Sequence, residues 1–232
     1  RAEARNLPIP HAGDKRTAVY LEAAACLRRR YADHLVLAGC IGPFSLAARL
    51  VGVSEALEMT LAEPELMHEV VGKSRDFLIA YTRAFQAAGA DGVIMAEPAA
   101  GLLSPRGLAA FSSAYVRSIA ETFQGGQFDI ILHNCAARLA HLPGVLETGL
   151  RQFHFGAPMD IVAALRKVGP DVVLSGNLDP TSVFVQLPPS EVAARARDLL
   201  AATREHPNFV ISSGCDIPPT APLASLDAFY EA

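Results

Sequence analysis

Short apolar runs alternate with longer amphipathic segments along most of this chain. Six of these runs are rich in aliphatic side chains and bounded by turn-forming residues, a pattern that predicts buried strands. The predicted strands are residues 34–39, 92–96, 130–132, 152–155, 171–175 and 208–211. The segments between them are richer in alanine, leucine and arginine, which favour helices. The predicted helices are residues 17–31, 44–51, 55–61, 64–88, 105–123, 136–148, 161–168, 190–205 and 225–232, with an interruption of the 136–148 helix at Pro143-Gly144 as an alternative. Residues 176–180 are predicted to form a turn after the fifth strand.

Strands that alternate with helices, without hairpin signals or an internal repeat, predict βα units and a parallel sheet. Polar residues collect where the predicted strands end, and in a (β/α)8 barrel the active site is built from those ends. These residues are Cys40, Glu97, His133, Cys135, His154, Asn177, Asp179 and Cys215.

Six predicted strands fall short of the eight in a closed barrel. The alternatives are an open sheet, or an α/β fold of the (β/α)8, TIM-like type that lacks its N-terminal strands in this chain. We favour the second, a single partial barrel domain over residues 1–232. We expect the missing strands to lie in sequence upstream of this chain in the native protein.

Composition narrows the class of protein. The chain has 232 residues, is 51% hydrophobic and carries a net charge of −4, and its basic residues are scattered, which argues against a nucleic-acid partner. Four cysteines without close pairing do not indicate a disulfide framework. The longest apolar region, residues 35–53, is interrupted by glycine, proline and arginine, which argues against a membrane span. We therefore expect a soluble, cytoplasmic protein.

One set of strand-end residues suggests a zinc site. His133 and Cys135 are two residues apart just past a predicted strand, so both side chains can reach the same point. Cys215 follows the last predicted strand. One imidazole and two thiolates fill three tetrahedral positions around Zn²⁺ and leave one open, which is typical of catalytic zinc. The alternative is that the cysteines are small buried apolar residues and His133 is a structural histidine.

Five motifs in this order resemble the uroporphyrinogen decarboxylase superfamily over residues 34–231, the later two-thirds of a family member. They are Gly42-Pro43-Phe44-Ser45-Leu46, Ala87-Ala88-Gly89-Ala90-Asp91-Gly92, Leu103-Ser104-Pro105, Gly176-Asn177-Leu178-Asp179-Pro180 and Ser213-Gly214-Cys215-Asp216-Ile217-Pro218-Pro219.

Within that superfamily, the His-x-Cys and distant Cys resemble the zinc methyltransferases that move a methyl group from a methylated corrinoid to a thiol such as coenzyme M. The resemblance implies a TIM-like barrel, Zn²⁺, and methylcobalamin or a corrinoid-carrying protein as the methyl donor. This chain has Cys215 where true decarboxylases have a histidine, and Arg49 where they have a tyrosine. Ala136 and Ala137 stand where related methyltransferases often have glycine.

The expected site contains further polar residues. Glu97 is a candidate resting fourth zinc ligand that the thiol would displace, or else a carboxylate behind the ligands or at a helix start. We expect His154, Asn177 and Asp179 to bind substrate, although a half-buried structural His154 and a turn-forming Asp179 are alternatives. The expected partners are a small thiol and the corrinoid, and a homodimer is compatible with this interpretation. Two other functions remain open, a metal-free tetrapyrrole decarboxylase and a non-catalytic corrinoid- or thiol-binding module.

Overall fold

The computed structural model describes residues 4, 6–123 and 126–232. The chain folds into two compact units, residues 1–133 with 143–150 and residues 134–142 with 151–232. Within the described residues, none of the helices combines the length and the apolar character that crossing a membrane requires.

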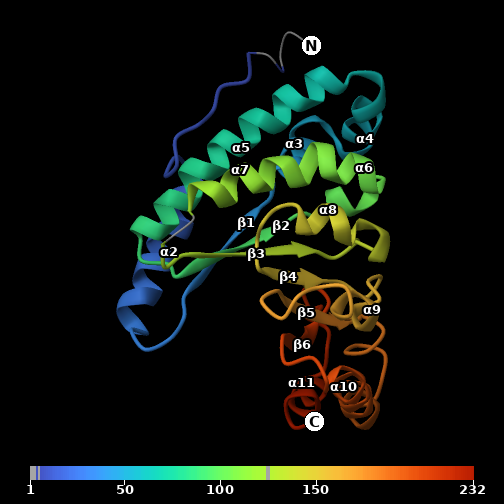
Figure 1. Ribbon diagram of the computed structural model, residues 1–232. Coiled ribbons are helices and arrows are strands. Elements are labelled where there is room, and N and C mark those ends of the chain that lie inside the picture. The colour runs from blue at the N-terminus through green and yellow to red at the C-terminus, as the bar shows by residue number, and fades with distance from the viewer. Residues whose placement is uncertain (1–3, 5, 124–125) are drawn as a thin grey trace. The chain divides into compact units, whose positions relative to one another are not determined.

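Within the described part of the first unit, three parallel strands pair in chain order (Figure 1). They are β1 (Leu37–Ile41), β2 (Gly92–Ala96) and β3 (Asp129–Asn134). The register places Ile41 opposite Ala96 and Ala96 opposite His133, so the carboxyl ends of the strands lie in one row. Side chains alternate between the faces of the sheet. In β2, Met95 is fully buried whereas its neighbour Ile94 is 40% exposed.

Helices and short helical turns connect these strands. They are α2 (Arg16–Arg30), α3 (Pro43–Val51), α4 (Val53–Ala62), α5 (Pro64–Ala87), η1 (Ala99–Leu102), α6 (Pro105–Leu108), the π-helical turn η2 (Ala109–Ser113) and α7 (Ala114–Thr122). Figure 1 shows α5 and α7 side by side. Pro64 occupies the first turn of α5, where no backbone donor is lost, and Gly89 follows the helix with a positive φ. Leu78 and Phe85 of α5 are almost completely buried, and each contributes about 1.5–3 kcal/mol.

The second unit has its own set of parallel strands, β4 (Gln152–Phe155), β5 (Val173–Leu178) and β6 (Phe209–Ser213). Its helices are α9 (Ile161–Leu165), α10 (Pro189–Thr203) and α11 (Leu223–Tyr230), and α10 packs beside α11 (Figure 1). Phe184 and Val192 form the centre of a core against which Leu226 and Phe229 pack. Between β3 and β4 lie the short turn η3 (Leu139–His141) and α8 (Leu142–Leu146).

The predicted α/β class with parallel strands is confirmed, and the bounds predicted for β2 and β4 are correct. The first strand was predicted too early, because the paired segment begins at Leu37 opposite Gly92. Leu35, inside the predicted strand, is 81% exposed. The helix predicted at residues 105–123 is interrupted by the π-helical turn η2.

Two other predictions were wrong for identifiable reasons. The helix expected at 136–148 begins only at Leu142, since Pro143 is tolerated in the first turn of a helix but not in its interior. The predicted turn at Gly176 instead continues β5 through Leu178. Gly176 has a φ of +132°, and a Cβ there would overlap the carbonyl oxygen of Phe155, so only glycine allows this strand to continue.

Candidate metal centre

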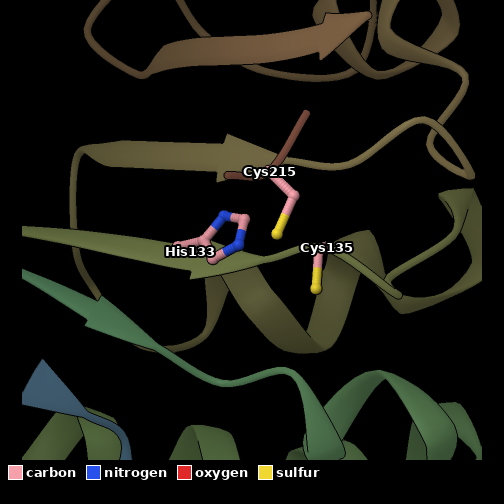
Figure 2. A group of neighbouring side chains, drawn as sticks. All are labelled: His133, Cys135 and Cys215. Atoms are coloured by element: carbon pink, nitrogen blue, oxygen red, sulfur yellow. The ribbon is translucent and has the colours of Figure 1, made fainter. Parts of the chain in front are cut away.

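The three predicted zinc ligands come together. His133 is in β3, Cys135 follows that strand directly, and Cys215 follows β6. Their ligand atoms all lie within 4.8 Å of one another, and Figure 2 shows the Cys215 sulfur beside the His133 ring. No other group of three such residues is found in the described part of the chain. The convergence predicted from the strand ends is therefore present, while the role of these residues as metal ligands stays a prediction.

The donor set fits Zn²⁺ in chemistry and in size. Zinc binds thiolate sulfur at about 2.3 Å and imidazole nitrogen at about 2.0–2.1 Å, so ligand atoms in a tetrahedral site are about 3.5–3.8 Å apart. The observed upper limit of 4.8 Å means that the ligand atoms would approach one another by about 1.3 Å or less. Rotation about side-chain bonds is enough for a movement of that size.

The surroundings of Cys135 favour the neutral thiol when no cation is present. Burial raises the pKa of Cys135 to about 11, and the neighbouring Cys215 and Asp216 act in the same direction. A divalent cation bound between the sulfurs would reverse this balance, because thiolate is the form that binds zinc.

Close backbone packing in the second unit brings the cysteine-bearing loops together. A Cβ at Gly156 would overlap the backbone carbonyl of Cys135, and a Cβ at Gly214 would lie 2.9 Å from the Gly156 Cα. Asn177 fixes the same loop, since its Nδ2 donates to the carbonyls of Gly156 at 3.2 Å and Met159 at 2.6 Å. Gly156, Gly214 and the side-chain amide of Asn177 thus set the distances between the loops that follow β3, β4 and β6.

His154 is half-buried and is held by β6. Its Nε2 lies 2.9 Å from both the Ser212 hydroxyl and the Ser213 carbonyl, to which the N–H donates. Burial lowers the pKa of His154, which favours the neutral ring. These contacts give His154 a structural role next to the Cys215 loop, and substrate binding by His154 or Asn177 stays a prediction.

Asp179 forms a local turn. Its Oδ1 accepts hydrogen bonds from the backbone N–H groups of Thr181 at 3.0 Å and Ser182 at 2.6 Å. The bond from Ser182 is the main reason that the pKa of Asp179 is lowered. These contacts match the turn-forming alternative for Asp179, and substrate binding by this residue stays a prediction.

Glu97 is completely buried and bonded to the N-terminus of α3. Its Oε1 accepts from Phe44 N at 2.9 Å and Ser112 Oγ at 3.1 Å. Its Oε2 accepts from Ser45 N at 2.9 Å and Ser45 Oγ at 2.6 Å. A carboxylate at this position satisfies helix donors that have no partner within the helix. Glu97 does not belong to the cluster of His133, Cys135 and Cys215, and its role as a resting ligand stays a prediction.

Burial raises the pKa of Glu97, although the hydrogen bonds from Ser45, Phe44 and Ser112 oppose that effect. A Cβ at Gly42 would overlap the Cγ of Glu97, so glycine is required at that position. The Glu97 N–H donates to the His133 carbonyl at 2.7 Å, which ties the buried carboxylate to the strand that carries the histidine.

Sequence reasoning missed Ser112 and Gly156. Ser112 reaches Glu97 from η2, and π-helical turns are not visible in a hydrophobic pattern. Gly156 directly follows β4, and a glycine at the end of a strand is the signal that could have identified it.

Comparisons with known proteins agree with this architecture. A family model described as uroporphyrinogen decarboxylase (URO-D) matches residues 1–232, which is more than the residues 34–231 expected. The uroporphyrinogen decarboxylase of Actinobacillus pleuropneumoniae serotype 5b is 28% identical over 246 residues, covering 100% of this chain and 68% of that protein. This chain thus spans about two-thirds of the length of that relative.

Solved structures with a similar fold include the following two. A methyltransferase from Methanosarcina mazei has a TM-score of 0.84 at 22% identity, covering 97% of this chain and 67% of that one. A B12-independent methionine synthase from a Shewanella species, in complex with selenomethionine, has a TM-score of 0.58 at 14% identity, covering 91% and 65%. At these identities the likeness concerns the fold, and it agrees with the predicted α/β, TIM-like class.

Proposed function

This chain belongs to the uroporphyrinogen decarboxylase family, and within that family we propose that it is a zinc-dependent enzyme that moves a methyl group from a methylated corrinoid to a thiol. The observation that supports this proposal is the group of His133, Cys135 and Cys215, whose ligand atoms lie within 4.8 Å of one another. The likeness to a protein named as a methyltransferase is in keeping with it. Cys215 distinguishes the proposed activity from decarboxylation, because the resemblance implies a histidine at this position in decarboxylases.

In the proposed reaction, His133, Cys135 and Cys215 would hold Zn²⁺ and leave one position for the acceptor. Bound zinc would lower the pKa of the acceptor thiol, so that it is present as thiolate at neutral pH. The two cysteinates balance the charge of the dication, and this keeps the acceptor sulfur electron-rich. A corrinoid donor would supply the methyl group to this sulfur and would keep the electron pair of its broken cobalt–carbon bond, while the thiol proton would go to solvent.

The residues around the cluster would position the reacting groups. Gly156 and Gly214 allow the loops that carry Cys135 and Cys215 to lie close to the loop after β4. Asn177 holds the loop after β4 by two hydrogen bonds. His154, neutral and bonded to the Ser213 carbonyl, holds the strand that precedes Cys215. The proposed donor is methylcobalamin or a corrinoid-carrying protein. The proposed compartment is the cytoplasm, where thiols stay reduced.

Metal analysis of purified protein tests this proposal. We expect about one zinc per chain in the wild type and loss of most of it in Cys215→Ser, because a tetrahedral site loses one of its protein ligands. Cys26→Ser is the matched control, since Cys26 is an exposed free cysteine outside the cluster, and it should keep the metal. Full zinc occupancy in Cys215→Ser, or absence of zinc from the wild type, would contradict the assignment.

Decarboxylation of a tetrapyrrole is the second candidate, and it is favoured by the name of a relative 28% identical to this chain. That activity would not require the cysteine cluster. Metal-free protein and the Cys215→Ser variant would then release CO2 from uroporphyrinogen at the wild-type rate. Binding of the corrinoid or the thiol without turnover would instead indicate a binding module.

A further inference from the structure

Cys135 and Cys215 form a close pair of thiols, and both belong to the second unit. Their sulfur atoms lie no more than 4.8 Å apart, and a hydrogen bond joins the two side chains (Figure 2). Cys135 follows β3 whereas Cys215 follows β6, so their closeness comes from the fold and not from the sequence. Such a pair can do one thing that neither cysteine can do alone, which is to form a disulfide.

The backbone of the second unit sets the spacing of the two thiols. Cys135 packs against Gly156, where a Cβ would overlap the Cys135 carbonyl. Gly214, the neighbour of Cys215, packs against the same glycine, since a Cβ at Gly214 would lie 2.9 Å from the Gly156 Cα. Asn177 Nδ2 donates to the Gly156 carbonyl at 3.2 Å and holds that loop. Because these contacts join protein atoms, the two thiols stay close whether or not a cation is bound between them.

A disulfide between Cys135 and Cys215 requires only a local movement. An S–S bond is about 2.05 Å long, so the two sulfurs would approach one another by about 2.8 Å or less. Both cysteines lie in loops outside the strands, and rotation of each side chain between staggered positions moves its sulfur. Both side chains are half-buried, so a small oxidant in the solvent can reach them.

We propose that Cys135 and Cys215 form a reversible intramolecular disulfide, and that this bond closes the metal site under oxidising conditions. A disulfide sulfur is no longer the thiolate that binds zinc, so the disulfide and bound zinc exclude one another. Disulfides that form in the reducing cytoplasm are usually transient and act in catalysis or redox sensing. The effect on zinc rests on the proposed function, whereas formation of the disulfide does not.

A disulfide of low mass, such as oxidised glutathione, is the proposed oxidant. The thiolate of one cysteine attacks a sulfur of the oxidant, which gives a mixed disulfide and releases one glutathione thiolate. The thiolate of the other cysteine then attacks the protein sulfur of the mixed disulfide and releases the second glutathione. The protein thus loses two protons and two electrons, and the two glutathione molecules take them up. An excess of reduced glutathione drives the same steps backward.

Peptide mapping of native, metal-free protein after incubation with oxidised glutathione tests the proposal. Trypsin cuts after lysine and arginine, so the cysteines fall in four different peptides, residues 17–28, 31–49, 118–138 and 205–232. We expect one dominant link, between 118–138 and 205–232, that dithiothreitol removes. Cys26→Ser leaves both thiols of the pair in place and should form the same link. Protein unfolded in urea should instead give links among all four peptides, because the contacts that hold the pair together are lost.

Zinc separates this proposal from the proposed function. One equivalent of Zn²⁺ added before the oxidant should slow formation of the link at least about tenfold, because thiolates that bind zinc are not available for attack. His133→Gln, which removes a proposed ligand but neither thiol, should form the link and lose this protection. A link that zinc does not slow would support the disulfide and contradict the metal site.

Three results would overturn the proposed disulfide. The first is absence of the link between 118–138 and 205–232 from native wild-type protein. The second is a mixture of links like that found in urea, which would mean that the native fold does not select this pair. The third is a stable glutathione adduct on Cys135 or Cys215 that never gives way to the link, because the second thiol would then be out of reach.

Discussion

Replacing Glu97 by glutamine leaves the size of the side chain almost unchanged but removes one of its two acceptor oxygens. The carboxylate accepts from the backbone N–H groups of both Phe44 and Ser45, one on each oxygen. In Glu97→Gln the amide nitrogen must face one of these two donors. The hydroxyls of Ser45 and Ser112 can rotate to accept from the amide, whereas a backbone N–H cannot turn away. One buried donor at the start of α3 is therefore left without a partner.

The expected loss of folding stability in Glu97→Gln follows from this one unpaired N–H group. A buried donor without an acceptor costs about 1–3 kcal/mol. For a chain of this length, 1 kcal/mol corresponds to about 2–4 °C in Tm, so a cost of about 2 kcal/mol lowers Tm by about 4–8 °C. Glu121→Gln is the matched control, because Glu121 is exposed on α7 and its substitution should leave Tm unchanged.

The cost should also depend on pH with a definite sign. Burial raises the pKa of Glu97 in the folded state above its ordinary value of 4.5. The stability that protonated Glu97 contributes is fully present below the unfolded pKa and is lost as pH rises through the folded pKa, by up to about 1.4 kcal/mol per unit. Glutamine does not titrate, so the difference between wild type and Glu97→Gln should shrink as pH rises.

Thermal or urea unfolding between pH 4.5 and 8, with zinc content measured in parallel, checks this reasoning. If Glu97 serves as the anchor of α3, the variant keeps its zinc while losing stability. An unchanged Tm, or a difference that grows with pH, would refute the role of burial and hydrogen bonding at Glu97. Loss of zinc at unchanged stability would instead make Glu97 a ligand.

Two other changes give clear expectations. Gly156→Ala would force a Cβ against the carbonyl of Cys135, so zinc affinity should fall at least about tenfold, as metal affinity does when the support of a ligand is lost. Gly169→Ala, which meets open space, should not change it, and equal affinity in both variants would contradict this account. Burial lowers the pKa of His154, so wild-type stability should fall as pH drops below 6.5, by up to about 1.4 kcal/mol per unit. Unfolding curves of His154→Gln should show a weaker decline than those of wild type or the exposed His11→Gln, and an identical decline would exclude His154 as its source.

The sequence was sufficient for the parts of the fold that depend on local pattern. The strand at residues 92–96 and the helix that begins at Pro64 follow from an apolar run and a proline signal, and both are found. His133 and Cys135 could be paired because side chains two apart on a strand share a face. Cys215 was joined to them by its position after a strand and by the resemblance, since sequence distance alone carries no information about contact.

The rest depended on tertiary contacts. Glu97 was noticed as a strand-end acid, but its four donors come from α3 and η2, which are distant in sequence. The early end predicted for β5 was wrong because glycine was interpreted as a turn, whereas Gly176 lets the strand pass close to Phe155. A backbone approach of this kind is fixed by the neighbouring strand, and no local pattern reveals it.

Gly42 and Glu97 share one volume, because the space that a Cβ would occupy at the first position is filled by the Cγ of the second. Only one of the two positions can therefore carry a side chain that fills this space. This fixes the order in which evolution or a protein engineer can change them. A smaller residue must first appear at position 97, with its cost to α3, before any side chain can be accepted at position 42. The reverse order passes through a chain in which β2 and the start of α3 cannot both keep their places.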